Sequence, residues 1–261
     1  MASNASIEDL KNIINNIRSH GKTGNLRAVV QDLGQMEKIT KNQKSNQEKQ
    51  KHLAEAYRHA IDPMGVGKKF KEIDQLIIKI HDILQNFSDS EIIQEIYSEA
   101  LNAAIFHYIK NERDKDIHKK LKSLGSFSCN HQDNPFVQFN YAQSLSEVAK
   151  YFAEKEDKEV TYNLLWEIIG IVTFYPGKEI LTQVSEGLVK CINIAGSKLT
   201  LNELEDVASR IDEFINFTNE FETQQKLTTC QGIIFRHIAG KRMRKGFSPD
   251  GKVHKKYKKS S

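Results

Sequence analysis

The sequence predicts an all-α protein, a right-handed α-solenoid of stacked helix pairs that repeat about every 43–44 residues. Three observations support this fold class. Proline occurs only 4 times in 261 residues, which argues against collagen-like, sandwich and linker-dominated chains. Apolar residues recur at helical spacing along most of the chain, and no long segment alternates at a period of two. Similar segments also recur at a nearly constant interval.

The first residues predict an amino-terminal helical segment over residues 1–50. Ser6 and Asp9 have the spacing of a capping box, and the helix that follows is expected to stop at Gly21. A second helix is expected over about 25–37 because leucine and valine recur on one face.

Residues 38–51 are almost wholly polar, and they fit either a solvated helix extension or a loose linker. The repeat domain is expected over residues 51–240. Its first helix should end near Asp62-Pro63, because a residue that precedes proline disfavours the helical conformation.

From Phe70 onward, helices follow one another with recognisable start and stop signals. Asn134 precedes a proline at the first helical position, and Thr200 with Glu203 forms a second predicted capping box. The helix over about 115–124 is expected to stop at Gly125, and the last helix is expected to end near Gly240. The expected helices cover about 70–84, 90–110, 115–124, 135–153, 158–173, 178–195, 201–217 and 220–240.

Four segments align without gaps at spacings of 44, 43 and 43 residues. They are Ile93–Leu101, Val137–Leu145, Ile180–Leu188 and Thr223–Gln231. Large apolar residues, small residues and leucines recur at the fifth, sixth and ninth positions, and Gln231 departs from this pattern. The predicted core therefore contains Tyr97, Tyr141, Val184, Leu101, Leu145 and Leu188. A single irregular helical bundle is the alternative architecture.

This spacing and pattern resemble the HEAT, armadillo and tetratricopeptide-like families of α-solenoids, over about Phe70 to Gly240. The period is closer to HEAT or armadillo than to the 34-residue tetratricopeptide unit. The resemblance implies an interaction scaffold that binds a partner protein along a helix-lined groove. The seventh repeat position would line this groove, with a solvated helix face as the alternative, and its residues are Glu99, Gln143, Glu186 and Thr229.

The charge of the chain is distributed unevenly. Residues 236–261 contain ten Lys or Arg and one acid, whereas residues 1–235 carry a net charge of −5. Residues 241–261 are interpreted as a basic flexible tail that contacts nucleic acid or another polyanion, or else only solubilises or addresses the chain. The candidate polyanion-binding residues are Lys241, Arg242, Arg244, Lys245, Lys252, Lys255, Lys256, Tyr257, Lys258 and Lys259.

No pattern in the sequence indicates catalysis, a metal or a cofactor. The sequence from Gly65 to Lys69 lacks the residues of a phosphate-binding loop and no strand precedes it, so an interhelical turn is expected there. Cys129 and His131 lie close together without further ligands. Three widely spaced cysteines predict free thiols in a reducing compartment.

The sequence also lacks a secretory signal and an apolar run long enough to span a membrane. We therefore expect a cytoplasmic protein, or a nuclear one in a eukaryote. The expected function is that of a non-enzymatic scaffold. The alternative is an RNA- or DNA-associated protein docked through its basic tail. An all-α enzyme is the third class, which no constellation of residues supports.

Overall fold

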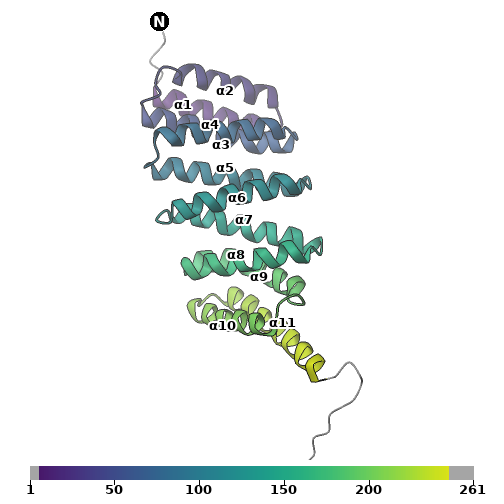
Figure 1. Ribbon diagram of the computed structural model, residues 1–261. Coiled ribbons are helices and arrows are strands. Elements are labelled where there is room, and N and C mark those ends of the chain that lie inside the picture. Colours follow the sequence, from purple (N-terminus) through teal and green to yellow (C-terminus); the bar gives the residue numbers. More distant parts are fainter. Residues whose placement is uncertain (1–5, 247–261) are drawn as a thin grey trace, which may run out of the picture. The chain divides into compact units, whose positions relative to one another are not determined.

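The computed structural model describes residues 6–246, which fold into eleven α-helices and contain no β-strand (Figure 1). The all-α prediction is thus confirmed for the described residues. The helices are α1 (Ile7–Lys22), α2 (Leu26–Thr40), α3 (Gln47–Val66), α4 (Phe70–Asn86), α5 (Glu91–Lys110), α6 (Asp114–Asn130), α7 (Pro135–Glu154), α8 (Lys158–Phe174), α9 (Lys178–Ala195), α10 (Leu201–Phe217) and α11 (Phe221–Gly246).

The chain divides into two compact units, and the boundary between Ser144 and Leu145 lies inside α7. In the first unit, α3 packs against α1, α2, α4 and α5, and α5 packs against α6. In the second unit, α9 packs against α8 and α11, and α10 packs against α11. Helices thus contact both their neighbours in the chain and helices two places away, which is compatible with a helical-repeat fold.

The repeat alignment identified five of its six predicted core residues correctly. Leu101, Leu145, Val184 and Leu188 are at most 1% exposed. Tyr97 is also buried, whereas Tyr141 was wrongly placed in the core and is only partly buried. The apolar face of each aligned helix therefore lies against the helices that surround it, and the burial of these side chains is the main stabilising contribution.

The predicted helix starts are confirmed where a side chain caps them. Ser6 Oγ accepts a hydrogen bond from the Asp9 amide at 3.2 Å, and Thr200 Oγ1 accepts one from the Glu203 amide at 3.2 Å. Asn134 Oδ1 likewise accepts from the Val137 amide at 3.3 Å. These contacts satisfy amide groups that the first turn of a helix leaves without partners.

Several predicted helix stops are wrong. Gly125 lies inside α6, and a Cβ there would lie 2.9 Å from the Tyr141 hydroxyl, so this glycine permits a close approach to α7. Gly21 lies inside α1, beside Pro63, and the left-handed residue after that helix is Gly24, with φ +73°. The last helix continues past Gly240 to Gly246, because glycine lowers helix propensity without terminating a packed helix.

Pro63 also fails to end its helix, since α3 continues to Val66. The proline carbonyl accepts a hydrogen bond from the Gly67 amide at 2.9 Å, and this bond completes the last turn. The polar stretch at residues 38–51 combines the two forms that the sequence left open. Its ends belong to α2 and α3, and a turn joins them over residues 41–46.

Candidate interaction sites

In the first unit, two of the predicted groove residues contact neighbouring helices. The Glu99 carboxylate lies 3.6 Å from Arg58 Nε of α3, although its side chain is 51% exposed. Gln143 Oε1 accepts a hydrogen bond from Asn102 Nδ2 at 2.6 Å. Both side chains therefore reach across a helix–helix junction, and binding of a partner by them stays a prediction.

In the second unit, Glu186 and Thr229 stand on different helices. Glu186 Oε2 lies 3.7 Å from Lys150 Nζ, and the Thr229 hydroxyl donates to the Gln225 carbonyl at 2.9 Å. Thr229 also lines a shallow groove of about 510 Å³ on the surface of α11. The other lining residues are Phe221, Gln224, Gln225 and Thr228.

The junction between α5 and the first half of α7 is buried and polar. Asn140 Nδ2 donates to Ser98 Oγ at 2.8 Å, and Ser144 Oγ donates to Asn102 Oδ1 at 2.7 Å. All four residues are at most 8% exposed. Because buried polar groups are costly without partners, this network requires α5 and α7 to lie in one register.

The junctions around α9 depend on close approach. A Cβ on Gly187 would lie 2.8 Å from the Cα of Ser146 on α7. A Cβ on Gly196, directly after α9, would lie 2.5 Å from the His237 ring of α11. The Thr182 hydroxyl donates to Glu220 at 2.6 Å, just before α11 begins. In these junctions α7 is therefore covered by α9, and α9 is covered by α11.

The last helix exposes the positions that the earlier helices bury. The repeat alignment pairs Ser98, Asn102 and Ile105 of α5 with Thr228, Gly232 and Phe235 of α11. The α5 residues are 0%, 8% and 0% exposed. Their α11 counterparts are all exposed, and Phe235 is 56% exposed.

These exposed positions form one continuous surface, the α11 stripe. Its members are Phe221, Gln225, Thr228, Gly232, Phe235, Ala239 and Met243, which follow one another at intervals of three or four residues. Phe221 and Met243 are 78% and 66% exposed. The opposite face of α11 packs into the second unit through Leu227, Cys230, Ile234 and Ile238, which are at most 7% exposed. Within residues 6–246 no later helix covers the stripe.

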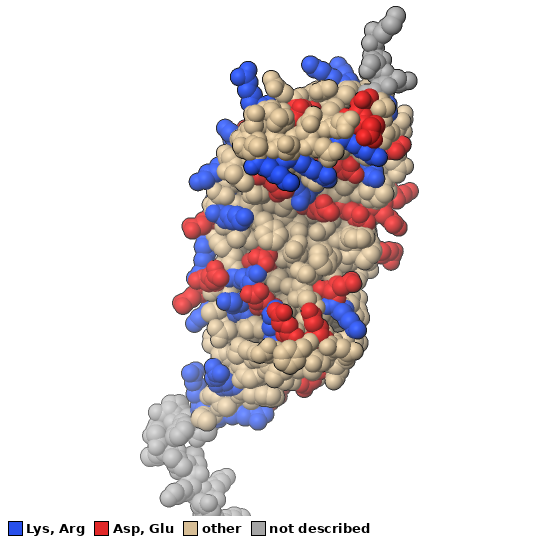
Figure 2. All heavy atoms as spheres, turned by 180° about the vertical axis from the view of Figure 1, so that it is seen from behind, with Lys and Arg blue, Asp and Glu red and all other residues tan. Residues whose placement is uncertain are grey.

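The carboxyl-terminal end of α11 carries part of the predicted basic tail. Arg236, His237, Lys241 and Arg244 line a pocket of about 190 Å³ with Ser197. Figure 2 shows Lys and Arg side chains gathered where the described chain ends. Lys241 Nζ donates to the Ser197 carbonyl at 3.1 Å.

Arg242, also in the predicted set, pairs instead with Glu205 of α10 at 2.8 Å. Lys245 lies within α11, and its side chain is outside the described part of the structure. The remaining predicted residues lie outside the described residues: Lys252, Lys255, Lys256, Tyr257, Lys258 and Lys259.

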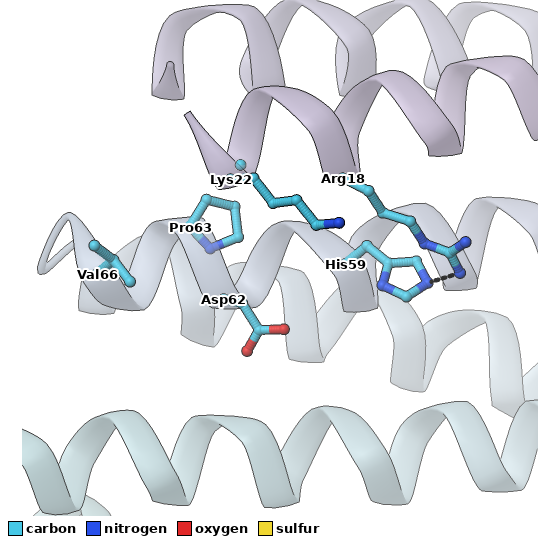
Figure 3. A pocket seen from close by; sticks show the side chains of 7 residues that line it. Arg18, Lys22, His59, Asp62, Pro63 and Val66 are labelled. Carbon is cyan, nitrogen blue, oxygen red and sulfur yellow. Dashed lines mark hydrogen bonds between the residues drawn. The ribbon is translucent and has the colours of Figure 1, made fainter. Parts of the chain in front are cut away.

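A second pocket lies between α1 and α3 in the first unit, and sequence reasoning did not identify it (Figure 3). Its volume is about 350 Å³. Arg18 Nη2 lies 2.5 Å from His59 Nε2, so the neutral His59 ring accepts a hydrogen bond from the guanidinium. Burial, followed by the charges of Arg18 and Arg58, lowers the pKa of His59 to about 4.

Asp62 stands at the edge of the same pocket. Burial alone would raise the pKa of Asp62, but a hydrogen bond from His107 and the charge of Arg58 together lower it to about 2. The two partners lie 3.1 Å and 3.0 Å away. The carboxylate thus serves the junction of α3 with α5.

The described residues show no metal or membrane feature. Among residues 6–246, no group of three or more His, Cys, Asp or Glu side chains could hold a metal ion. No described helix is both long and apolar enough to cross a membrane. The thiols of Cys191 and Cys230 are buried, and that of Cys129 is exposed, all three without a disulfide.

Comparison of the chain with protein-family models, curated proteins and solved structures gives no significant match.

Proposed function

We propose that this chain is a non-enzymatic interaction scaffold built from stacked helix pairs, and that it binds a helical segment on the α11 stripe. The observation that carries the proposal is the exposure of Thr228, Gly232 and Phe235. Their counterparts in α5 are buried against another helix. Phe221, Phe235 and Met243 on this stripe are each more than half exposed. Large apolar side chains gathered on one exposed helix face favour an interaction surface.

The stacked-pair architecture is supported by the sequence separation of the contacts between helices. Ser98 and Asn140 are 42 residues apart, Arg18 and His59 are 41 apart, and Thr182 and Thr223 are 41 apart. Such separations are expected when side chains contact their near-equivalents one repeat later. They favour the predicted repeat of 43–44 residues, and the right-handed superhelix stays a prediction.

The stripe also specifies the chemistry of its partner. Phe221, Phe235 and Met243 offer large apolar contacts, whereas Thr228 and Gly232 between them leave room for another helix to approach. The surface suits an amphipathic helix that lies along α11, as in other helix-in-groove complexes.

Photo-crosslinking tests this proposal directly. A photoreactive phenylalanine analogue is placed at position 235, and a matched control carries it at position 78. Ile78 of α4 is 58% exposed, almost the same as Phe235 at 56%, but it lies outside the stripe. We expect protein adducts from position 235 that position 78 does not give. Identical adduct patterns from the two positions would contradict the proposal.

The basic end of α11 favours a second candidate function, the binding of a polyanion such as RNA. The supporting observation is the convergence of Arg236, Lys241 and Arg244 around one pocket. Fluorescence anisotropy with single-stranded RNA at two salt concentrations tests this function. Each lost phosphate contact should reduce the log–log salt slope by about 0.7, so Arg244→Gln should flatten the slope if Arg244 binds phosphate. An unchanged slope would remove Arg244 from the binding site.

A further inference from the structure

We propose that the helical segment bound by the α11 stripe is the α11 stripe of a second copy of this chain, packed antiparallel about a two-fold axis at Gly232. This inference rests on the proposed function, because it names the partner of the same surface. It yields a closed dimer, since a two-fold interface uses the same patch on both copies.

The first argument is the order of residues along the stripe. Counted outward from Gly232, Phe221 and Met243 lie eleven positions away on either side, and Gln225 and Ala239 lie seven positions away. An antiparallel pair therefore brings Phe221 of one copy against Met243 of the other at both ends of the contact. These ends are about 33 Å apart at 1.5 Å per residue.

The second argument is charge. Glu222 and Arg242 lie ten positions on either side of Gly232. Their side chains are 73% and 63% exposed, although each also has a partner within its own chain, Lys226 and Glu205 respectively. The antiparallel arrangement keeps the two basic ends at opposite ends of the contact, each level with Glu222 of the other copy. A parallel arrangement would instead bring together the two basic ends, each of which carries Arg236, Lys241, Arg242 and Arg244.

The third argument is the space at the axis. A Cβ added to Gly232 would meet no atom within 4 Å, so the backbone of α11 is uncovered there. Helices approach most closely where small residues face each other, and Gly232 would face its own copy at the axis. Thr228 and Phe235 flank this position, so two phenylalanines would pack on either side of the close contact.

Sedimentation velocity over a range of protein concentrations tests the association. The full chain, of 29.9 kDa, should shift with concentration toward twice that mass. Phe235→Asp should abolish the shift, whereas the matched control Ile78→Asp should retain it. Because both side chains are exposed, both variants should keep the helical circular dichroism of the parent.

A single cysteine tests the register. In a Cys129→Ser background, Gly232→Cys should form a disulfide-linked dimer under mild oxidation, since the two thiols would meet at the axis. Gly34→Cys is the control, because Gly34 is another helical glycine with open space around a Cβ. A disulfide dimer from position 34 as readily as from position 232 would overturn the register.

A parent chain that remains monomeric at every concentration would overturn the second-copy proposal. The second-copy proposal would be overturned whether residues 247–261 or another protein covers the stripe. The proposed function has a separate test, since adducts to other proteins from position 235 would still support it. A monomer without specific adducts from position 235 would contradict both proposals.

Discussion

Helices α5 and α11 have aligned sequences but opposite surroundings. α5 is buried on nearly every side, and its Ser98 and Asn102 form hydrogen bonds with α7. α11 is buried along one face, and the counterparts of those residues, Thr228 and Gly232, are exposed. Polar side chains thus lie in the covered junction, while phenylalanine and methionine lie on the uncovered surface.

This difference shows that residue type alone does not identify an interaction surface in a helical repeat. A buried polar group is tolerated in α5 because α7 supplies its partner. Phe235 in α11 is 56% exposed, and its exposure beside Phe221 and Met243 supports the intermolecular contact that we propose for the stripe.

The largest expected effect is on stability, because a side chain in the core of α5 should contribute far more than one on the exposed face of α11. Leu101→Ala in α5 should lower the free energy of unfolding by about 2–5 kcal/mol, because Leu101 is only 1% exposed and the cavity cannot fill with solvent. Thr228→Ala in α11 should change it by less than about 0.5 kcal/mol. Urea titration followed by circular dichroism measures both values. Equal losses in the free energy of unfolding would contradict the difference between α5 and α11.

The polar junction should also be sensitive to substitution. Asn102→Ala removes hydrogen bonds to Gln143 and Ser144 and leaves buried partners behind, so it should cost about 1–3 kcal/mol. Asn193→Ala is the control, because Asn193 is an exposed asparagine on α9. The same urea titration applies. If Asn102→Ala were as stable as the control, the network would not hold α5 against α7.

Two glycines sharpen the distinction between covered and uncovered helices. Gly187→Ala should destabilise the chain by about 1–3 kcal/mol, because the new Cβ would lie 2.8 Å from Ser146 Cα. Gly232→Ala should stabilise the dilute monomer by about 0.4–1 kcal/mol, because its Cβ has open space. Thermal unfolding at low protein concentration measures both. A loss of stability in Gly232→Ala would mean that α11 is covered within the monomer.

The smallest effect concerns pH and compares His59 of α3 with His237 of α11. The folded state lowers the pKa of His59 from 6.5 to about 4, so below pH 6.5 the unfolded chain binds more protons. The stability contributed by neutral His59 is therefore complete above pH 6.5 and is lost as the pH falls toward 4. Burial, Lys241 and Arg236 also lower the pKa of His237.

Melting temperatures measured between pH 7 and pH 4 test this sign. His59→Gln should flatten the dependence of melting temperature on pH, and His237→Gln should flatten it less. The reason is that neutral His59 accepts a hydrogen bond from Arg18. A steeper profile in His59→Gln would contradict the assigned direction.

Much of the fold was predictable because helix signals are local. Capping residues such as Ser6 and Thr200 satisfy nearby amides, and the leucine at the ninth repeat position lies in the core. The errors arose where glycine and proline were interpreted locally. Gly125 accommodates Tyr141, and Pro63 packs beside Gly21, and both contacts depend on residues far away in the sequence.

The candidate surface was less predictable. The repeat alignment correctly placed Thr228 and Thr229 on α11, but periodicity cannot reveal whether another helix covers them. The one available signal was Gln231, which replaces the leucine of the other segments at the ninth position. The pocket between Arg18 and His59 depends on the contact of α1 with α3, and no local motif specifies that contact.

Thiol labelling of two equivalent positions tests most directly whether the α11 stripe is uncovered in the monomer. Ser185 of α9 and Thr228 of α11 occupy the same repeat position. Each is replaced by cysteine, Ser185→Cys or Thr228→Cys, in a Cys129→Ser background. Labelling is measured at a concentration where the chain is monomeric. Ser185 is 0% exposed and Thr228 is exposed, so the thiol at position 228 should react rapidly. The thiol at position 185 should react only upon unfolding. Equal labelling rates, or protection at position 228 in the monomer, would contradict an uncovered α11 stripe.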